Sequence, residues 1–336
     1  MKAIQFLGMT AFMAAMLTGC SNDSDLAHSN FPDDNIIRVT AGVNGAVTRA
    51  ETLGTELNNK FSLTVVNKDT ENEYNYKYTH ENKIFQKIGT GTEWICNDIL
   101  LWQDAETPVD VAALAPVTNK DWIFQGILGN QNQFQTLEYE ITADQKTQKP
   151  ENDLLYYYKS NLVPKEALNS DGKLDIQFNH AFSMIDIIVT LGTEYSNKDN
   201  PINEVIVGGS KLKATIDVTN SEGVAYPSTM GENPETDITT IPVKFNKATT
   251  DQENSTAVSS CILIPQTIEA NKFKVTLKTS SKTYVWTSPS AITLETGHKY
   301  TLALTMGRDK LTAQKGNISA GSWTEGTGSG STLGTK

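Results

Sequence analysis

Apolar and polar residues alternate with a period of two along most of this chain, and this period constrains the fold more than any other feature. Side chains of a β-strand point alternately to opposite faces, so the alternation indicates strands with one buried face. Short turn sequences separate the alternating runs. Many strands with short polar connections predict an all-β fold of β-sandwiches rather than an α/β sheet. The clearest runs are residues 37–41, 61–65, 109–114, 211–218, 272–277 and 300–306, and the turn sequences are Asn44-Gly45, Asp171-Gly172, Gly208-Gly209, Glu222-Gly223 and Glu295-Thr296-Gly297.

Helical periodicity is weak, and the length of the chain suggests two domains. Residues 144–149 and 164–169 are expected to form no more than single helical turns. A chain of 336 residues is long enough to bury two cores. A polar stretch before the strong strand pattern at Leu174 predicts a domain boundary near residue 170. We therefore expect a β-sandwich at 35–170, a second β-sandwich at 171–323 and a Gly/Ser-rich tail at 324–336 that cannot build a core.

The first twenty residues have the pattern of an exported lipoprotein. Lys2 precedes an apolar stretch that is too short and too interrupted to remain as a membrane-spanning helix. The following Leu17-Thr18-Gly19-Cys20 resembles a bacterial lipobox, which implies removal of a signal peptide, 1–19, and acylation of Cys20. An ordinary signal peptide with an incidental cysteine is the alternative. Residues 20–34 are acidic and polar, so we expect a flexible tether that also resembles the surface-export signal of Bacteroidetes lipoproteins.

Patterns typical of catalysis and of nucleic-acid binding are missing from the sequence. The net charge is −11 and no basic stripe offsets it, which works against binding to nucleic acid. His28, His80, His180 and His298 are far apart and show none of the close pairing of a zinc site. No phosphate loop, nucleotide fingerprint or nucleophile elbow occurs. We expect no enzymatic activity, cofactor or metal, and we interpret His180 as a hydrogen-bonded structural histidine at a sheet edge.

The cysteines and aromatic residues have a structural and a functional interpretation. Cys96 and Cys261 lie in apolar runs and are expected to be separately buried free thiols, although an exported protein is allowed a disulfide. Trp94, Trp102, Trp122 and the tyrosines at 156–158 could form an aromatic platform for a sugar, but aromatic residues more often belong to the core, and we expect this of Trp102. Three consecutive tyrosines on a strand must point to both faces, so at least one ring is expected to be exposed.

Several local sequences, taken in their order, resemble the fimbrillin family of Bacteroidales pili. The resemblance covers the chain from about Asn35 to Trp323 and depends on the order of the pieces more than on any one of them. It implies two tandem β-sandwich domains of transthyretin-like, Greek-key topology. The pieces are 36–41 with 48–50, 94–102, 111–116, 153–155, 178–185, 263–266, 294–300 and 318–323.

The resemblance implies a route of assembly. The lipoprotein precursor would reach the cell outer membrane, held there by lipid on Cys20. An arginine-specific or trypsin-like surface protease would then cut between Arg49 and Ala50, so that the first strand leaves. A strand donated by another fimbrillin subunit would fill the apolar groove, as in β-augmentation. The family thus implies a structural subunit of a surface fimbrium that supports adhesion.

The scarcity of arginine and the character of the tail refine this expectation. Arg38 lies in a predicted strand and Arg308 in a predicted turn, so Arg308 is the one exposed competitor for the protease. The tail at 324–336 lacks the alternating large apolar residues of a donated strand, so a donor would come from 311–323. A tip, anchor or accessory subunit is therefore an alternative to a shaft subunit. A surface glycan-binding lipoprotein is the alternative from another class.

Overall fold

The structure is a computed structural model of the chain, in which β-strands dominate. The all-β prediction is confirmed. Of the two predicted helical turns, one is present as α1 (Pro164–Ala167), whereas 144–147, the described part of the other, form no helix. The structure describes residues 30–44, 60–68, 77–87, 93–117, 124–127, 130–134, 136–147, 152–195, 198–221, 223–250, 252–323 and 331–332.

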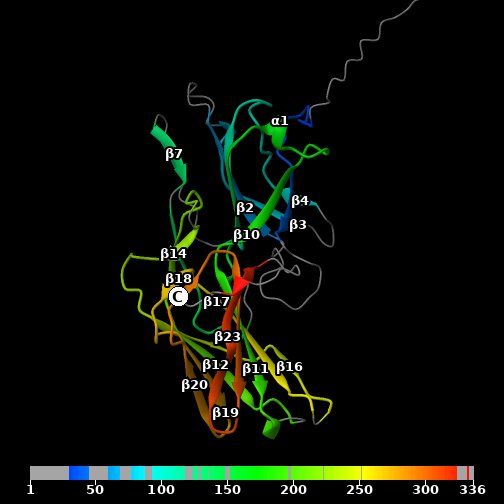
Figure 1. The fold of residues 1–336 in the computed structure, drawn as a ribbon. Coiled ribbons are helices and arrows are strands. Elements are labelled where there is room, and N and C mark those ends of the chain that lie inside the picture. The colour runs from blue at the N-terminus through cyan, green and yellow to red at the C-terminus, as the bar shows by residue number, and fades with distance from the viewer. Residues whose placement is uncertain are drawn as a thin grey trace, which may run out of the picture.

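A seven-stranded sheet encloses the first of two hydrophobic cores, in the upper part of Figure 1. Its two edge strands, β1 and β4, lie near each other, so the sheet curls around the core. At the centre Phe61 stacks on Phe85 and contacts the rings of Trp94 and Phe178 edge-on. The strand order is β1 (Val39–Val43), β10 (Leu174–His180), β9 (Leu155–Leu162), β5 (Val109–Ala115), β2 (Lys60–Asn67), β3 (His80–Lys87) and β4 (Trp94–Cys96).

Two further sheets pack face to face around the second core, in the lower part of Figure 1. Alternate residues of β11 and β12, such as Ile187 and Val207, meet in this core. One sheet has the order β16 (Lys244–Asn246), β17 (Thr256–Leu263), β11 (Ser183–Leu191), β22 (His298–Met306), β23 (Leu311–Ser322) and β24 (Ser331–Thr332), and the other β15 (Thr236–Thr240), β12 (Ile202–Ser210), β19 (Lys274–Thr279) and β20 (Thr283–Thr287).

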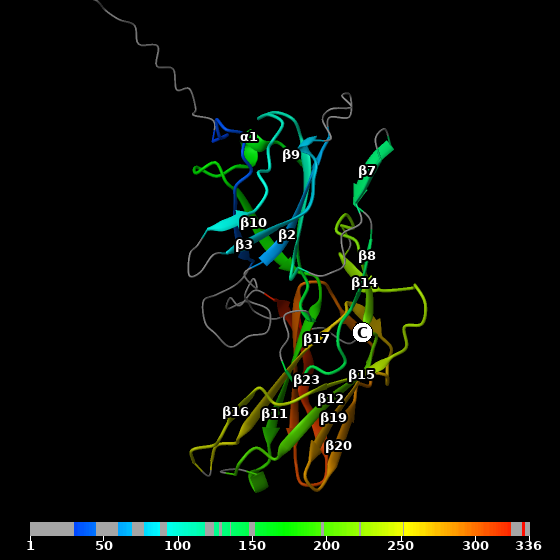
Figure 2. The same ribbon diagram turned by 180° about the vertical axis from the view of Figure 1, so that it is seen from behind.

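Smaller sheets flank the junction of the two cores. In Figure 2, β8 and β14 lie together between the upper and lower parts of the molecule. The short helix η3 (Thr193–Tyr195) follows β11. The small sheets are β14 (Ala225–Pro227) with β13 (Lys213–Ile216) and β8 (Leu137–Glu140), β18 (Gln266–Ile268) with β21 (Ile292–Leu294), and β6 (Phe124–Ile127) with β7 (Asn130–Phe134).

The chain passes from the first core to the second within a few residues. Phe178 on β10 belongs to the first core, whereas Ala181 and Phe182 belong to the second. Earlier in the chain, β8 pairs with β13, and Tyr139 packs into the second core. The expected boundary near residue 170 stays a prediction, and the strand after it, β10, lies in the seven-stranded sheet.

Two details of the sequence interpretation are wrong. The alternation at 109–114 predicted one exposed face, but β5 is buried along its whole length, because Leu114 joins the second core and the Asn161 amide donates to Asp110. The predicted turn at Gly208-Gly209 lies inside β12, where the register shifts. A Cβ on Gly209, whose φ is 91°, would lie 2.5 Å from a backbone oxygen, so this glycine permits close strand approach rather than a turn.

Candidate functional site

The first strand, β1, is held in the fold as an edge strand. It pairs in parallel with β10 over five residues, from Val39 opposite Leu174 to Val43 opposite Phe178. The Leu174 amide donates to the Arg38 carbonyl at 2.8 Å, and the Asn44 amide donates to the Phe178 carbonyl at 2.8 Å. Parallel pairs are slightly less stable per residue than antiparallel pairs, and an edge strand has a neighbour on one side only. Within the described residues, β1 is therefore paired with one neighbouring strand, β10, over a short ladder of hydrogen bonds.

The two faces of β1 have opposite character. Val39 and Val43 of β1, and Ile37 just before it, point into the first core and are each at most 9% exposed. On β10, Ile176 and the two residues that pair with Val39 and Val43 are buried on the same face. If β1 left its place, this row of side chains would line an apolar groove. We call this place, between β10 and residues 100–102, the β1 groove.

The outer face of β1 is polar and contributes to the register. The Thr40 hydroxyl donates to Asp175 at 2.9 Å, and the Asn44 side-chain amide donates to Asn179 at 2.8 Å. Between them Gly42 faces Gln177, whose side-chain oxygen would lie 3.1 Å from a Cβ at that position. A strand that replaces β1 therefore meets apolar pockets on one face, polar partners on the other and little space opposite Gln177.

Residues 100–102 form the other wall of the β1 groove. The Ile37 amide donates to the Leu100 carbonyl and the Trp102 amide donates to the Asn35 carbonyl, both at 2.9 Å. His80 supports this wall, because its Nε2 accepts a hydrogen bond from the Leu101 amide at 3.2 Å and lies 2.9 Å from the Leu101 carbonyl oxygen. One histidine thus positions the segment that pairs with residues 35–37, directly before β1.

Acid is expected to loosen this wall. Burial lowers the pKa of His80 from 6.5 and outweighs the hydrogen bond to the Leu101 carbonyl, which raises it, so the folded chain favours the neutral ring. A lowered pKa in the folded state means that stability is complete above pH 6.5 and is lost as pH falls below it. We expect the melting temperature to fall between about pH 7.5 and about pH 5.5, and to fall less in His80→Gln. Equal falls in both proteins, measured by thermal denaturation, would contradict this role of His80.

The predicted maturation residues lie outside the described residues. This applies to Cys20, Arg49 and Ala50, so lipidation and cleavage stay predictions. The other two arginines are described. Arg308 is where the sequence placed it, whereas Arg38 lies just before β1 rather than within a strand. The Arg38 carbonyl nevertheless accepts a hydrogen bond from the Leu174 amide, and the Arg38 guanidinium is bound to Asp34 at 2.6 Å. Arg308 lies exposed in the turn between β22 and β23.

His180 belongs to a buried polar cluster that sequence reasoning found only in part. Its Nδ1 lies 3.0 Å from the Asp153 carboxylate, and both side chains are at most 4% exposed. The ring of Trp323 stacks on the imidazole at a centroid distance of 3.8 Å. The predicted hydrogen bond is confirmed, but the position at a sheet edge is wrong, because β10 lies between β1 and β9. Asp153, His180 and Trp323 lie in separate sequence motifs, and nothing local to these motifs indicates that the three residues are in contact.

The aromatic residues and cysteines have mainly packing roles. Trp94 and Trp102 are buried in the first core and so cannot offer a face to a sugar, whereas Trp122 lies outside the described residues. None of the tyrosines at 156–158 is fully exposed, contrary to expectation, because each packs against one of the two cores. Cys96 and Cys261 are free thiols, the first half-buried and the second buried.

The described part of the chain has neither a metal-binding cluster nor a membrane-spanning helix. There, no three side chains among His, Cys, Asp and Glu gather in the way a metal ion requires. The described residues also contain no helix long and apolar enough to cross a membrane. The β1 groove is accordingly the candidate functional site.

Comparisons with known proteins find a matching sequence family and solved structures with a similar fold. The sequence model of the fimbrillin-like family matches residues 48–323. A candidate cell adhesion protein from Bacteroides ovatus is 19% identical, with a TM-score of 0.58 over 84% of this chain and 96% of that chain. Another from Bacteroides uniformis is 13% identical, with a TM-score of 0.54 over 87% and 100%. A fimbrial protein from Bacteroides vulgatus is 17% identical, with a TM-score of 0.50 over 85% and 99%. None of the curated proteins compared matches the chain.

Proposed function

Because the chain belongs to the fimbrillin-like family, we propose that it is a structural subunit of a surface pilus in which β1 is a temporary strand. The precursor is exported as a lipoprotein on Cys20 and is cut after Arg49 by an arginine-specific protease. Residues before the cut, including β1, then leave. The observation that carries this proposal is that β1 is an edge strand with a single parallel ladder and an apolar inner face.

The β1 groove is suited to receive a strand from another subunit. Its floor would be the apolar side chains of the first core, and its edge would be the main chain of β10. A strand added there gains main-chain hydrogen bonds from the open edge and specificity from alternate side chains. An unfilled groove of this kind exposes apolar surface to water, which favours rapid capture of a partner strand.

The C-terminal part of the chain favours an acceptor role. The segment at 311–323, where a donor was expected, forms β23, and it pairs with β22 along most of its length. Leu311, Ile318 and Trp323 are buried in the second core. Withdrawing this strand to donate it would open the second core of its own subunit. This supports a tip or accessory subunit that receives a strand over a shaft subunit that also donates one.

Proteolysis of the purified chain tests the proposal. We expect an arginine-specific protease to produce a single new N-terminus at Ala50, detected by N-terminal sequencing, and an Arg49→Ala variant to stay uncut. Mixed with a shaft subunit of the same bacterium, the cut chain is expected to form complexes that survive on an unboiled gel. Alone, it is expected to form no ladder.

Each other outcome has a distinct meaning. Ladders formed by the cut chain alone would replace the acceptor role with a shaft role. A cut chain that stays monomeric with every partner, and whose β1 stays bound, would contradict strand exchange.

A further inference from the structure

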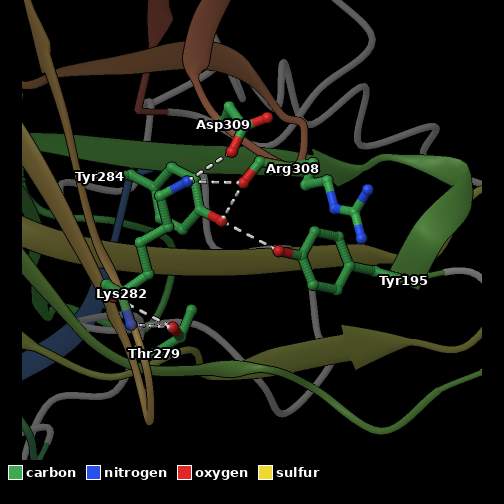
Figure 3. Close-up of polar contacts among 6 residues, drawn as sticks. All are labelled: Tyr195, Thr279, Lys282, Tyr284, Arg308 and Asp309. Atoms are coloured by element: carbon green, nitrogen blue, oxygen red, sulfur yellow. Dashed lines mark hydrogen bonds and ion pairs between the residues drawn. The ribbon is translucent and has the colours of Figure 1, made fainter.

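The turn between β22 and β23 presents an arginine that a surface protease could recognise. Arg308 is exposed, and Figure 3 shows its guanidinium pointing away from the polar contacts of its own backbone. An exposed arginine in a hairpin turn resembles a cleavable loop tip. A cut after Arg308 would break the covalent link between β22 and β23, which both contribute to the second core. Maturation after Arg49 alone therefore requires that the Arg308–Asp309 bond resist the protease.

The carbonyl oxygen of Arg308 is held by two side chains from the neighbouring hairpin (Figure 3). Lys282 Nζ and the Tyr284 hydroxyl each donate to it at 2.9 Å. Lys282 Nζ also lies 2.9 Å from an Asp309 carboxylate oxygen, and the hydroxyls of Tyr195 and Tyr284 are 2.9 Å apart. We call the two hydrogen bonds from Lys282 and Tyr284 to the Arg308 carbonyl the Arg308 clamp. It links the turn to β20, whose edge lies beside β23.

The clamp occupies the atom that proteolysis needs. Hydrolysis after Arg308 adds water across the Arg308–Asp309 bond, leaving a carboxylate on Arg308 and an amine on Asp309. In the transition state, negative charge develops on the Arg308 carbonyl oxygen, which must accept hydrogen bonds from the protease. Here that oxygen already accepts two, and the Gly307 amide holds the turn closed through the Lys310 carbonyl at 3.0 Å. Cleavage requires local opening first.

We propose that Lys282 and Tyr284 protect the Arg308–Asp309 bond and thereby restrict an arginine-specific protease to Arg49. This inference depends on the proposed maturation after Arg49. The guanidinium of Arg308 stays available to a protease pocket, so the site is recognised but not cut. Arg38 is protected in the same way, since its carbonyl accepts from the Leu174 amide at 2.8 Å and Asp34 holds its guanidinium.

The test is a time course of native proteolysis followed by mass spectrometry. The variant Lys282→Ala/Tyr284→Phe removes both donors and keeps the buried Tyr284 ring, so the core stays filled. Because each hydrogen bond contributes about 1 kcal/mol and 1.4 kcal/mol is about a factor of ten, we expect cleavage after Arg308 at least about tenfold faster than in the wild type. Melting curves establish that the variant is folded.

Two control variants separate the clamp from other causes. Tyr195→Phe removes a hydroxyl next to the clamp but leaves both donors to the Arg308 carbonyl, so we expect it to stay uncut at Arg308. Asp309→Ala removes the acidic residue after the bond, which some proteases avoid, and leaves both donors, so its rate is expected to rise much less than that of the double variant.

The results distinguish this inference from the proposed function. Wild-type cleavage after Arg308 at a rate similar to that after Arg49 would overturn the clamp and leave the maturation site standing. A folded Lys282→Ala/Tyr284→Phe variant that stays uncut at Arg308 would likewise overturn the protective role of the clamp without affecting the maturation site. No cleavage after Arg49 in any protein would instead contradict the proposed function.

Discussion

A chain that begins at Ala50, and so lacks β1, is expected to lose about 5 kcal/mol or more of the free energy that stabilises its first core. The side chains of Ile37, Val39 and Val43 are buried there, and each such side chain contributes about 1.5–3 kcal/mol. Whole domains are stable by only about 5–15 kcal/mol. The truncated chain is therefore expected to be barely folded around its first core until another strand enters.

Denaturation and fluorescence measure this loss. We expect the truncated chain to unfold at a lower urea concentration and to bind a hydrophobic dye. Its tryptophan emission is expected to shift to the red, because Trp94 and Trp102 lie in the first core. The truncated chain keeps all the described strands of the second core, so the part of the urea transition that reports on the second core is expected at an unchanged urea concentration.

A peptide supplied in trans provides the control. A synthetic peptide of residues 34–44 is expected to restore the original midpoint, because it carries the whole of β1. The same peptide with Val39→Asp and Val43→Asp places two carboxylates in apolar pockets and is expected to have no effect. A truncated chain as stable as the intact one, without dye binding, would contradict the role of β1.

His180→Ala is expected to cost about 3–5 kcal/mol, because it leaves the Asp153 carboxylate buried without its partner. Burial already raises the pKa of Asp153, which shows how costly its charge is in this place. The change also removes the ring on which Trp323 stacks, and Trp323 lies at the end of β23. The cluster of Asp153, His180 and Trp323 thus connects the end of β10, where the chain passes from the first core to the second, with the end of β23 in the second core.

Urea denaturation of matched variants measures this effect. His298→Ala is the control, because its side chain is 38% exposed and its loss is expected to cost no more than about 0.5 kcal/mol. In the double variant Asp153→Ala/His180→Ala, no charge is left buried, so the loss is expected to be smaller than the sum of the two single losses. A cost below about 1 kcal/mol for His180→Ala would show that the cluster contributes little.

Local pattern predicted most elements but few of their contacts. The alternation at 300–306 is β22, and the glycine before it, Gly297, has the positive φ of 67° that its turn requires. The same reasoning missed the contact of Asp153 with His180, separated by 27 residues, and the clamp on Arg308. These contacts depend on which strands become neighbours, and a run of six residues does not contain that information.

The sequence by itself determined that the chain is all-β, where most strands run and which residues resemble a lipobox and a cleavable arginine loop, because these depend on neighbouring residues. Only the tertiary structure decided that β1 pairs with β10, about 135 residues later, and that β23 is built into its own core. Alternation says that a strand has an apolar face but does not say which core covers it. That choice is made when many distant side chains pack together, and it is what places β1 at the edge of the seven-stranded sheet.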